Sequence, residues 1–153
     1  MAQPQPQYES KKLAQCFLTK WGTEIHIPDS IFSSLQSLGK NIVAVIPGDS
    51  KKVSLFLTNS NRILFVKLLL DKSSLNESFF SSLRQTLRDL KMDNLFSTGV
   101  CFKDEICVWE GVFEFDRDDH FQEIQIKFGH VLHVKQARFE KIELPRDDPK
   151  KNE

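Results

Sequence analysis

The sequence predicts an α+β protein in which a small β-rich module precedes a module of order β-α-β-β-α-β. Three observations support this. Short alternating segments separated by turn residues fill residues 12–58. A nearly continuous apolar run, RILFVKLLL, follows at residues 62–70. Two stretches with helical spacing of apolar residues then alternate with strand-like segments up to residue 144.

Length, charge and cysteine count narrow the classes of protein. The 153 residues suit one domain or two small ones, and a net charge of zero gives no indication of nucleic-acid binding. Three cysteines predict reduced thiols in a cytosolic protein rather than a disulfide framework. Without an apolar run of membrane-spanning length or a signal-peptide core, we expect a cytoplasmic protein with no membrane partner.

Both ends of the chain predict disorder. Residues 1–11 are rich in Gln and Pro and lack periodicity, and residues 145–153 are charged and contain two prolines.

The first module spans residues 12–58. Two strands are expected at residues 13–19 and 23–27, and a helix begins after Pro28 with Asp29 as its N-cap and ends at a left-handed Gly39. The apolar positions of this helix are Ile31, Phe32, Leu35 and Leu38. Residues 42–46 and 53–58 then predict a hairpin around Pro-Gly-Asp-Ser.

The second module spans residues 62–144. Its first strand, at residues 62–70, is expected to be buried on both faces, and Ser74 with Glu77 forms a capping-box pattern for a helix that runs to Leu90. The segments that follow are a hairpin of residues 96–102 and 106–115, a helix capped by Asp118 or Asp119, and a strand at residues 134–144. Residues 124–128 also alternate as a strand would; we favour helix, because the last strand needs a crossover to join the sheet.

The second module resembles the ACT domain, a ferredoxin-like sandwich that commonly binds amino acids or other small effectors. The resemblance rests on Asp71 directly after the first strand, on the helix through Leu90, and on the tail Gly-His-Val-Leu-His-Val at residues 129–134. It implies an effector site at the loop after the first strand. The ligand-binding residues expected from it are Asp71, Ser73, Ser74, Leu75, Asn76 and Asn94.

The first module resembles the AbrB-like swapped-hairpin DNA-binding domain. Gly-Thr-Glu-Ile-His-Ile-Pro at residues 22–28, followed by Ile31 and Leu35, carries this resemblance. It implies a homodimer with interlaced strands and a DNA-binding role. No arginine precedes Arg62, so the expected DNA contacts are weak, salt-sensitive ones from lysines. The residues expected to bind DNA are Lys11, Lys12, Lys20 and Thr23.

Two further groups of residues could bind a metal ion, but we favour structural roles for both. Cys101 and Cys107 together with His130 and His133 contain the ligand types of a zinc site, but their spacing better suits buried structural cysteines and surface histidines. The acidic residues 116, 118 and 119 suit the start of a helix better than a cation site. No nucleophile motif or phosphate loop occurs, so the sequence predicts neither an enzyme nor a cofactor.

Taken together, these patterns predict a dimeric regulatory protein of the transcription-regulator type with an ACT-type effector-sensing domain. The alternative is a protein-interaction adaptor that does not bind DNA, in which both modules serve only as dimerisation surfaces. The absence of early arginines favours the adaptor, as does Lys72-Ser73-Ser74 in place of the Pro-Gly pair that is frequent in ACT domains.

Overall fold

The computed structural model describes residues 15, 18, 20, 22–48, 51–102 and 105–145. The chain divides into two compact units, residues 1–40 and 41–153, which are considered separately below. The tails expected at residues 1–11 and 145–153 lie outside the described residues, apart from Pro145, and so does most of the strand expected at residues 13–19. No helix among the described residues is long and apolar enough to cross a membrane.

The first unit contains helix α1 (Asp29–Leu35), close to the predicted position. The predicted details around it were wrong. Residues 23–27 are not a strand, because no described segment pairs with them. Pro28 is the N-cap residue. Asp29 lies in the first turn, where its negative charge interacts favourably with the helix dipole but its side chain caps no amide. The helix ends at Gln36, whose backbone is right-handed, and Gly39 does not adopt the left-handed conformation that was expected at the helix end.

The second unit begins with the predicted hairpin, formed by β1 (Asn41–Val45) and β2 (Ser54–Thr58). The two strands are antiparallel, and Val43 faces Phe56 across the pair. Because side chains alternate along a strand, Val43, Val45 and Phe56 share one face of the hairpin, and Ile42 and Leu55 lie on the other. Both faces are therefore apolar.

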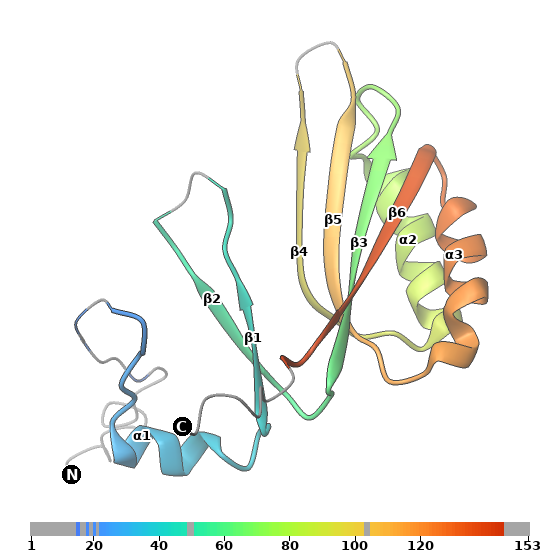
Figure 1. The fold of residues 1–153 in the computed structure, drawn as a ribbon. Coiled ribbons are helices and arrows are strands. Elements are labelled where there is room, and N and C mark those ends of the chain that lie inside the picture. The colour runs from blue at the N-terminus through green and yellow to red at the C-terminus, as the bar shows by residue number, and fades with distance from the viewer. Residues whose placement is uncertain are drawn as a thin grey trace, which may run out of the picture. The chain divides into compact units, whose positions relative to one another are not determined.

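A four-stranded antiparallel sheet follows. It contains β3 (Arg62–Leu70), β4 (Asn94–Cys101), β5 (Cys107–Glu114) and β6 (Val134–Glu143) in the order β4-β5-β3-β6. Helices α2 (Glu77–Leu90) and α3 (Phe121–Gly129) cover one face of the sheet, and the short 3₁₀ helix η1 (Asp118–His120) precedes α3 (Figure 1). The α+β class is thus confirmed, and the element order β-α-β-β-α-β agrees with the predicted one.

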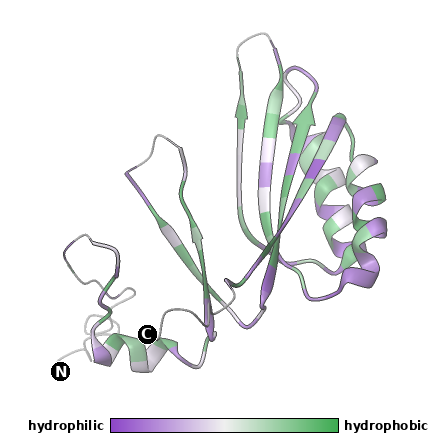
Figure 2. Cartoon of the chain, in the orientation of Figure 1, coloured by the Kyte–Doolittle hydropathy of each residue, from purple (hydrophilic) through white to green (hydrophobic). Residues whose placement is uncertain are grey.

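Strand β3 is the central element of the hydrophobic core. Leu64, Val66, Leu68 and Leu70 are completely buried on the face that the helices cover. The intervening residues 63, 65, 67 and 69 are only partly buried. The expectation of burial on both faces was therefore wrong: the apolar run has one fully buried face because helices pack on only one side of the sheet (Figure 2).

The helix termini also differ from the prediction. Asn76 caps α2, since its side chain accepts from the Phe79 amide at 3.0 Å, whereas the Ser74 hydroxyl donates to the Lys72 carbonyl at 3.3 Å. The Ser74–Glu77 capping box was therefore wrong, because Glu77 is itself the first helical residue. His120 rather than an aspartate occupies the N-cap position of α3, after the 3₁₀ turn, and its side chain makes no capping hydrogen bond. Residues 124–128 are helical as preferred.

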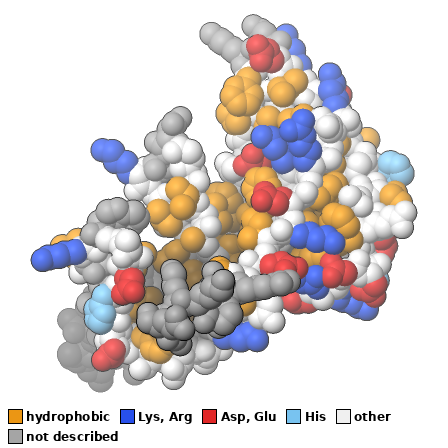
Figure 3. Space-filling model, viewed as in Figure 1, with side chains coloured by type: hydrophobic (Ala, Val, Ile, Leu, Met, Phe, Trp, Pro, Cys, Tyr) orange, Lys and Arg blue, Asp and Glu red, His pale blue; other side chains and the backbone are white. Residues whose placement is uncertain are grey.

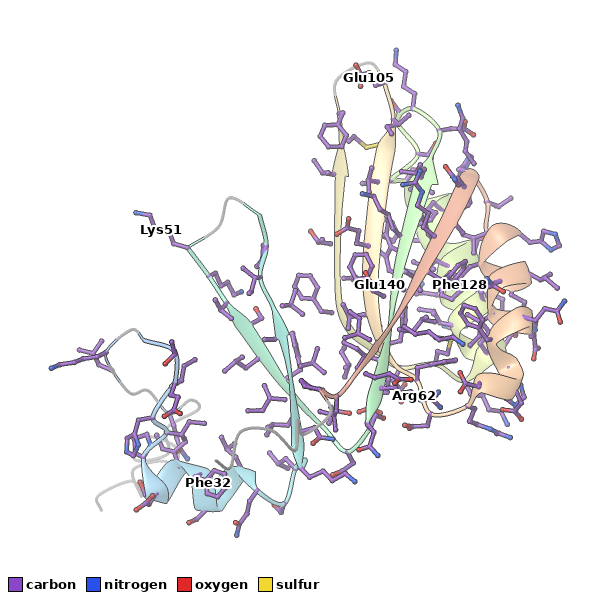
Figure 4. The ribbon with its side chains drawn as sticks, in the orientation of Figure 1. Phe32, Lys51, Arg62, Glu105, Phe128 and Glu140 are labelled. Atoms are coloured by element: carbon purple, nitrogen blue, oxygen red, sulfur yellow. A yellow bond between two sulfur atoms is a disulfide. The ribbon has the colours of Figure 1, made fainter. Side chains whose placement is uncertain are left out.

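Aromatic packing fixes the helices on the sheet. The Phe113 and Phe128 rings meet edge to face with centroids 5.8 Å apart, and Phe128 points from α3 towards the sheet (Figure 4). Gly111 stands between Trp109 and Phe113 on the same face of β5. A Cβ atom at residue 111 would lie 2.3 Å from Trp109 Cη2 and 2.9 Å from Phe113 Cε2, so glycine leaves room for both rings.

This packing predicts opposite effects for two glycine substitutions. Gly111→Ala should destabilise the fold by about 1–3 kcal/mol, because neither buried ring has space to retreat. The matched control Gly129→Ala should be neutral or stabilise by up to about 1 kcal/mol, since residue 129 is helical and has nothing within 4 Å of the added methyl. Urea unfolding measures both, and equal effects of the two substitutions would contradict the packing described.

Candidate functional site

The loop expected to bind an effector joins β3 to α2, and its aspartate has partners within the protein. The Asp71 amide donates to the His133 carbonyl at 3.1 Å, and the Asp71 carboxylate lies 3.2 Å from Lys135 Nζ. This ion pair is largely exposed, so it competes only weakly with an external ammonium group. Asp71 is therefore already used to join this loop to the start of β6.

The other residues of the loop are also largely structural. Ser74 is buried and bonded to the loop backbone, and Asn76 caps the helix. Leu75 packs against the core and close to Gly99, while Ser73 is exposed with a left-handed φ of 58°. The amides of Leu75 and Asn76, which donate no hydrogen bond within the described part of the chain, are among those available to an anion.

Asn94, the sixth residue expected at this site, lies at the other end of the sheet. It pairs with Phe113, which in turn pairs with Leu64, six residues before the end of β3. At 3.3–3.4 Å per residue this places Asn94 about 20 Å from the loop. The prediction that Asn94 neighbours the loop was wrong, because β3 and β4 run in the same direction and α2 returns the chain to the far end.

The residues expected to bind DNA are not assembled into a surface by the described structure. Lys20 and Thr23 are both exposed, and Thr23 lies in a bend. Lys11 and Lys12 lie outside the described residues. The DNA-binding surface therefore stays a prediction.

The acidic residues after β5 form ion pairs and hydrogen bonds. Asp118 accepts hydrogen bonds from Arg62 and from Lys141, the latter at 3.0 Å, and Asp116 accepts from the Ser60 hydroxyl at 2.9 Å. Arg62 lies at the start of β3 (Figure 4). The hydrogen bond from Arg62, followed by that from Lys141, lowers the pKa of Asp118 below its usual value. These partners explain the cluster without a cation, and no described group of three or more residues suits a metal ion.

Cys101 and Cys107 form a disulfide, which corrects the expectation of reduced cysteines. They face each other across the β4–β5 pair, with Cα atoms 4.0 Å apart. The next pair is hydrogen-bonded through the Phe102 amide and the Ile106 carbonyl, so the cysteines occupy a site where side chains approach closely. Pairing through the hairpin also removes both thiolates from the metal site that was considered with His130 and His133.

Two surfaces stand out that the sequence patterns did not identify. The outer face of the β1–β2 hairpin is apolar and exposed: Ile42 is 51 % exposed and Ile46 is 73 % exposed. The second surface is a groove along α2 that contains Arg84 and Arg88. The unbroken apolar run at residues 42–46 was a signal for the first surface, since a strand with such a run has apolar side chains on both faces, and the spacing of the two arginines was a signal for the second.

Comparison with known proteins leaves function to be argued from these residues. No family model matches the sequence, and no curated protein matches it. Among solved structures, a similar chain is the uncharacterized protein TM1266 from Thermotoga maritima, with 16% sequence identity and a TM-score of 0.38. The match covers 55% of this chain and 98% of that chain. A likeness of this strength assigns neither a family nor an activity.

The ion pairs of Asp118 predict a contribution to stability that depends on pH. Because its pKa is lowered in the folded state, the stabilisation is present at pH values above the pKa of the unfolded chain and is lost as pH falls through the folded value. Arg62→Ala should raise the Asp118 pKa towards its ordinary value, and Lys141→Ala should raise it less. Carboxyl NMR titration measures this. A pKa unchanged in both variants would contradict the described pairing.

Proposed function

We propose that the chain is a homodimeric regulatory protein that acts by binding a ligand or a partner, with the β1–β2 hairpin as its dimerisation element. The observation that supports this is the outer face of the hairpin, defined as residues 42, 44, 46, 53, 55 and 57. These residues are all apolar, and no charged side chain interrupts them. Val53 and Leu55 are 42 % and 47 % exposed, in addition to Ile42 and Ile46.

The inner face of the hairpin is covered by the same unit, which holds the outer face in place. Phe56 meets Phe96 of β4 with ring centroids 6.0 Å apart, and Val43 is 6 % exposed. The Thr58 hydroxyl donates to the Glu114 carboxylate at 2.5 Å, and the side-chain amide of Asn41 donates to the Ser60 carbonyl at 2.9 Å. A two-stranded hairpin alone is marginal in water, so these contacts account for its order. Its outer face stays largely exposed, although Ile42 and Ala44 also border a cavity that Ile142 and Leu144 line.

A second copy fits this face better than a charged partner. The face is uniformly apolar, so it is complementary to itself, as a two-fold interface requires. In the described two-stranded sheet each strand also has one unpaired edge, which can accept another strand. Lys51 is exposed at the tip (Figure 4), so charge repulsion favours an arrangement in which the two tips point apart.

In this proposal the β3–β6 sheet with its two helices is a ferredoxin-like, ACT-type module that responds to a ligand or partner. The strand order and the placement of both helices on one face support this assignment. A transcription regulator would also bind DNA. The adaptor alternative, without DNA or an effector at Asp71, is favoured by the structural roles of Ser74 and Asn76.

The dimer can be tested by placing one charge on the apolar face. The wild-type protein should have twice the 17.7 kDa chain mass by light scattering at micromolar concentration, and Leu55→Glu should be monomeric, because a dimer would bury an unpaired carboxylate. The control Ile126→Glu adds the same charge at an exposed position of α3 and should stay dimeric. Circular dichroism verifies folding of each variant. A wild-type monomer, or a dimer that survives Leu55→Glu, would contradict the proposal.

A thermal-shift screen separates the effector-sensing form from the adaptor form. If an amino acid binds the loop after β3, a hundredfold excess over its dissociation constant should add about 2.7 kcal/mol of stability, and Asp71→Ala should abolish this gain. If no amino acid raises the melting temperature, the adaptor form is supported. A hit that Asp71→Ala leaves intact would place the effector site elsewhere.

A further inference from the structure

A polar groove runs along the outer surface of α2 and is closed at one side by Leu132. Its volume of 520 Å³ is in the range of small-molecule sites. The residues that line it are Ser78, Ser81, Ser82, Arg84, Gln85, Arg88 and Leu132. The groove lies on the helix side of the sheet, whereas the hairpin contacts Phe96 on the other side, so its function does not depend on the proposed dimer.

The two arginines of the groove are a like-charge pair with no counter-ion among the described residues. Arg84 and Arg88 are one helical turn apart, and like charges at this spacing destabilise a helix. Neither side chain forms an ion pair or hydrogen bond with any described residue, whereas Arg62 pairs with Asp118 and Arg117 with Asp119. The helix dipole accounts for Arg88 near the C-terminus of α2, but it does not account for Arg84 in the middle.

Hydroxyl groups beside the arginines complete a set of hydrogen-bond donors. The Ser82 hydroxyl accepts from the Leu132 amide at 3.1 Å, which fixes this side chain and leaves its proton to donate. The Ser81 hydroxyl, exposed on the same helix, has no partner among the described residues. Ser78, in contact with His133 at 2.9 Å, holds the turn before β6 against α2 and so maintains the wall of the groove.

We propose that this groove binds the phosphate group of a small ligand, such as a nucleotide. Two guanidinium forks and two hydroxyls offer more donors than the two oxygens of a carboxylate can accept, and they suit the three terminal oxygens of a phosphate monoester. Leu132, 54 % exposed, provides an apolar surface for the body of the ligand. The groove is short, since only residues 78–88 of α2 and Leu132 line it, and this favours a small molecule over a nucleic-acid strand, which would follow a longer basic surface.

Calorimetric titration of the full chain with AMP, ATP, inorganic phosphate and AMP's uncharged analogue adenosine tests this site. A phosphate-bearing probe should bind, and adenosine should not bind measurably. Arg84→Ala and Arg88→Ala should each weaken binding by about tenfold or more. The control Arg138→Ala removes the same charge from an exposed position on β6 and should change affinity by less than about twofold, since only long-range attraction is lost.

Stability measurements keep the result interpretable. The double variant Arg84→Ala with Arg88→Ala should unfold at the same or a slightly higher temperature without ligand, because it removes a repulsion and introduces a good helix former. Failure of all phosphate probes to bind the wild type would overturn the proposal, and so would equal weakening by Arg138→Ala. Binding of a thymidine 20-mer with no binding of the nucleotides would assign the surface to nucleic acid and also overturn it.

Discussion

The burial of one face of β3 under α2 and α3 is the constraint on which the rest of the second unit depends. Leu64, Val66, Leu68 and Leu70 are completely inaccessible, and they meet the Phe79 and Phe128 side chains of the two helices in one cluster. Helices on only one side leave the other face of the sheet partly apolar and without helical cover. Any additional element of the chain, or a partner, is driven towards that face by the same hydrophobic effect.

The hairpin covers only part of this face. It places Phe56 against Phe96 on the uncovered side, and the sheet beyond this contact keeps Val100 and Ile142 about half exposed. Figure 3 shows hydrophobic side chains on the viewed surface of the sheet and hairpin, interrupted by a band of charged ones. Register places Lys67, Glu110 and Arg138 in one row across this face. Apolar patches of this kind are typical of association surfaces, which is why the proposed function concerns binding.

The element order of the second module was accessible from sequence because its signals are local and strong. The apolar run of β3 and the helical spacing in α2 have no competing interpretation. Details that depend on neighbours were missed: Asn76 rather than Ser74 caps α2, since the loop folds Ser74 into the protein. The disulfide was missed because only the strand register shows that Cys101 faces Cys107.

The candidate site was harder to predict, for a related physical reason. Linear proximity joined Asn94 to the effector loop, but the direction of β4 separates them. The sequence also left Asp71 without an evident partner. Lys135 forms an ion pair with it from β6, which is far away in sequence but lies next to β3 in the sheet. The Arg84–Arg88 pair is a local feature, yet its significance depends on whether a described carboxylate reaches either guanidinium, which only the three-dimensional arrangement reveals.

The most direct test of the proposed self-association is amide hydrogen exchange of β1 and β2 at two protein concentrations. If the outer hairpin face is buried by a second copy, protection of these amides should rise with concentration, while that of β3 stays constant because this inner strand of the four-stranded sheet lies outside the proposed interface. Protection of β1 and β2 that is independent of concentration, across a range in which the mass changes from monomer to dimer, would contradict the account by placing the interface elsewhere.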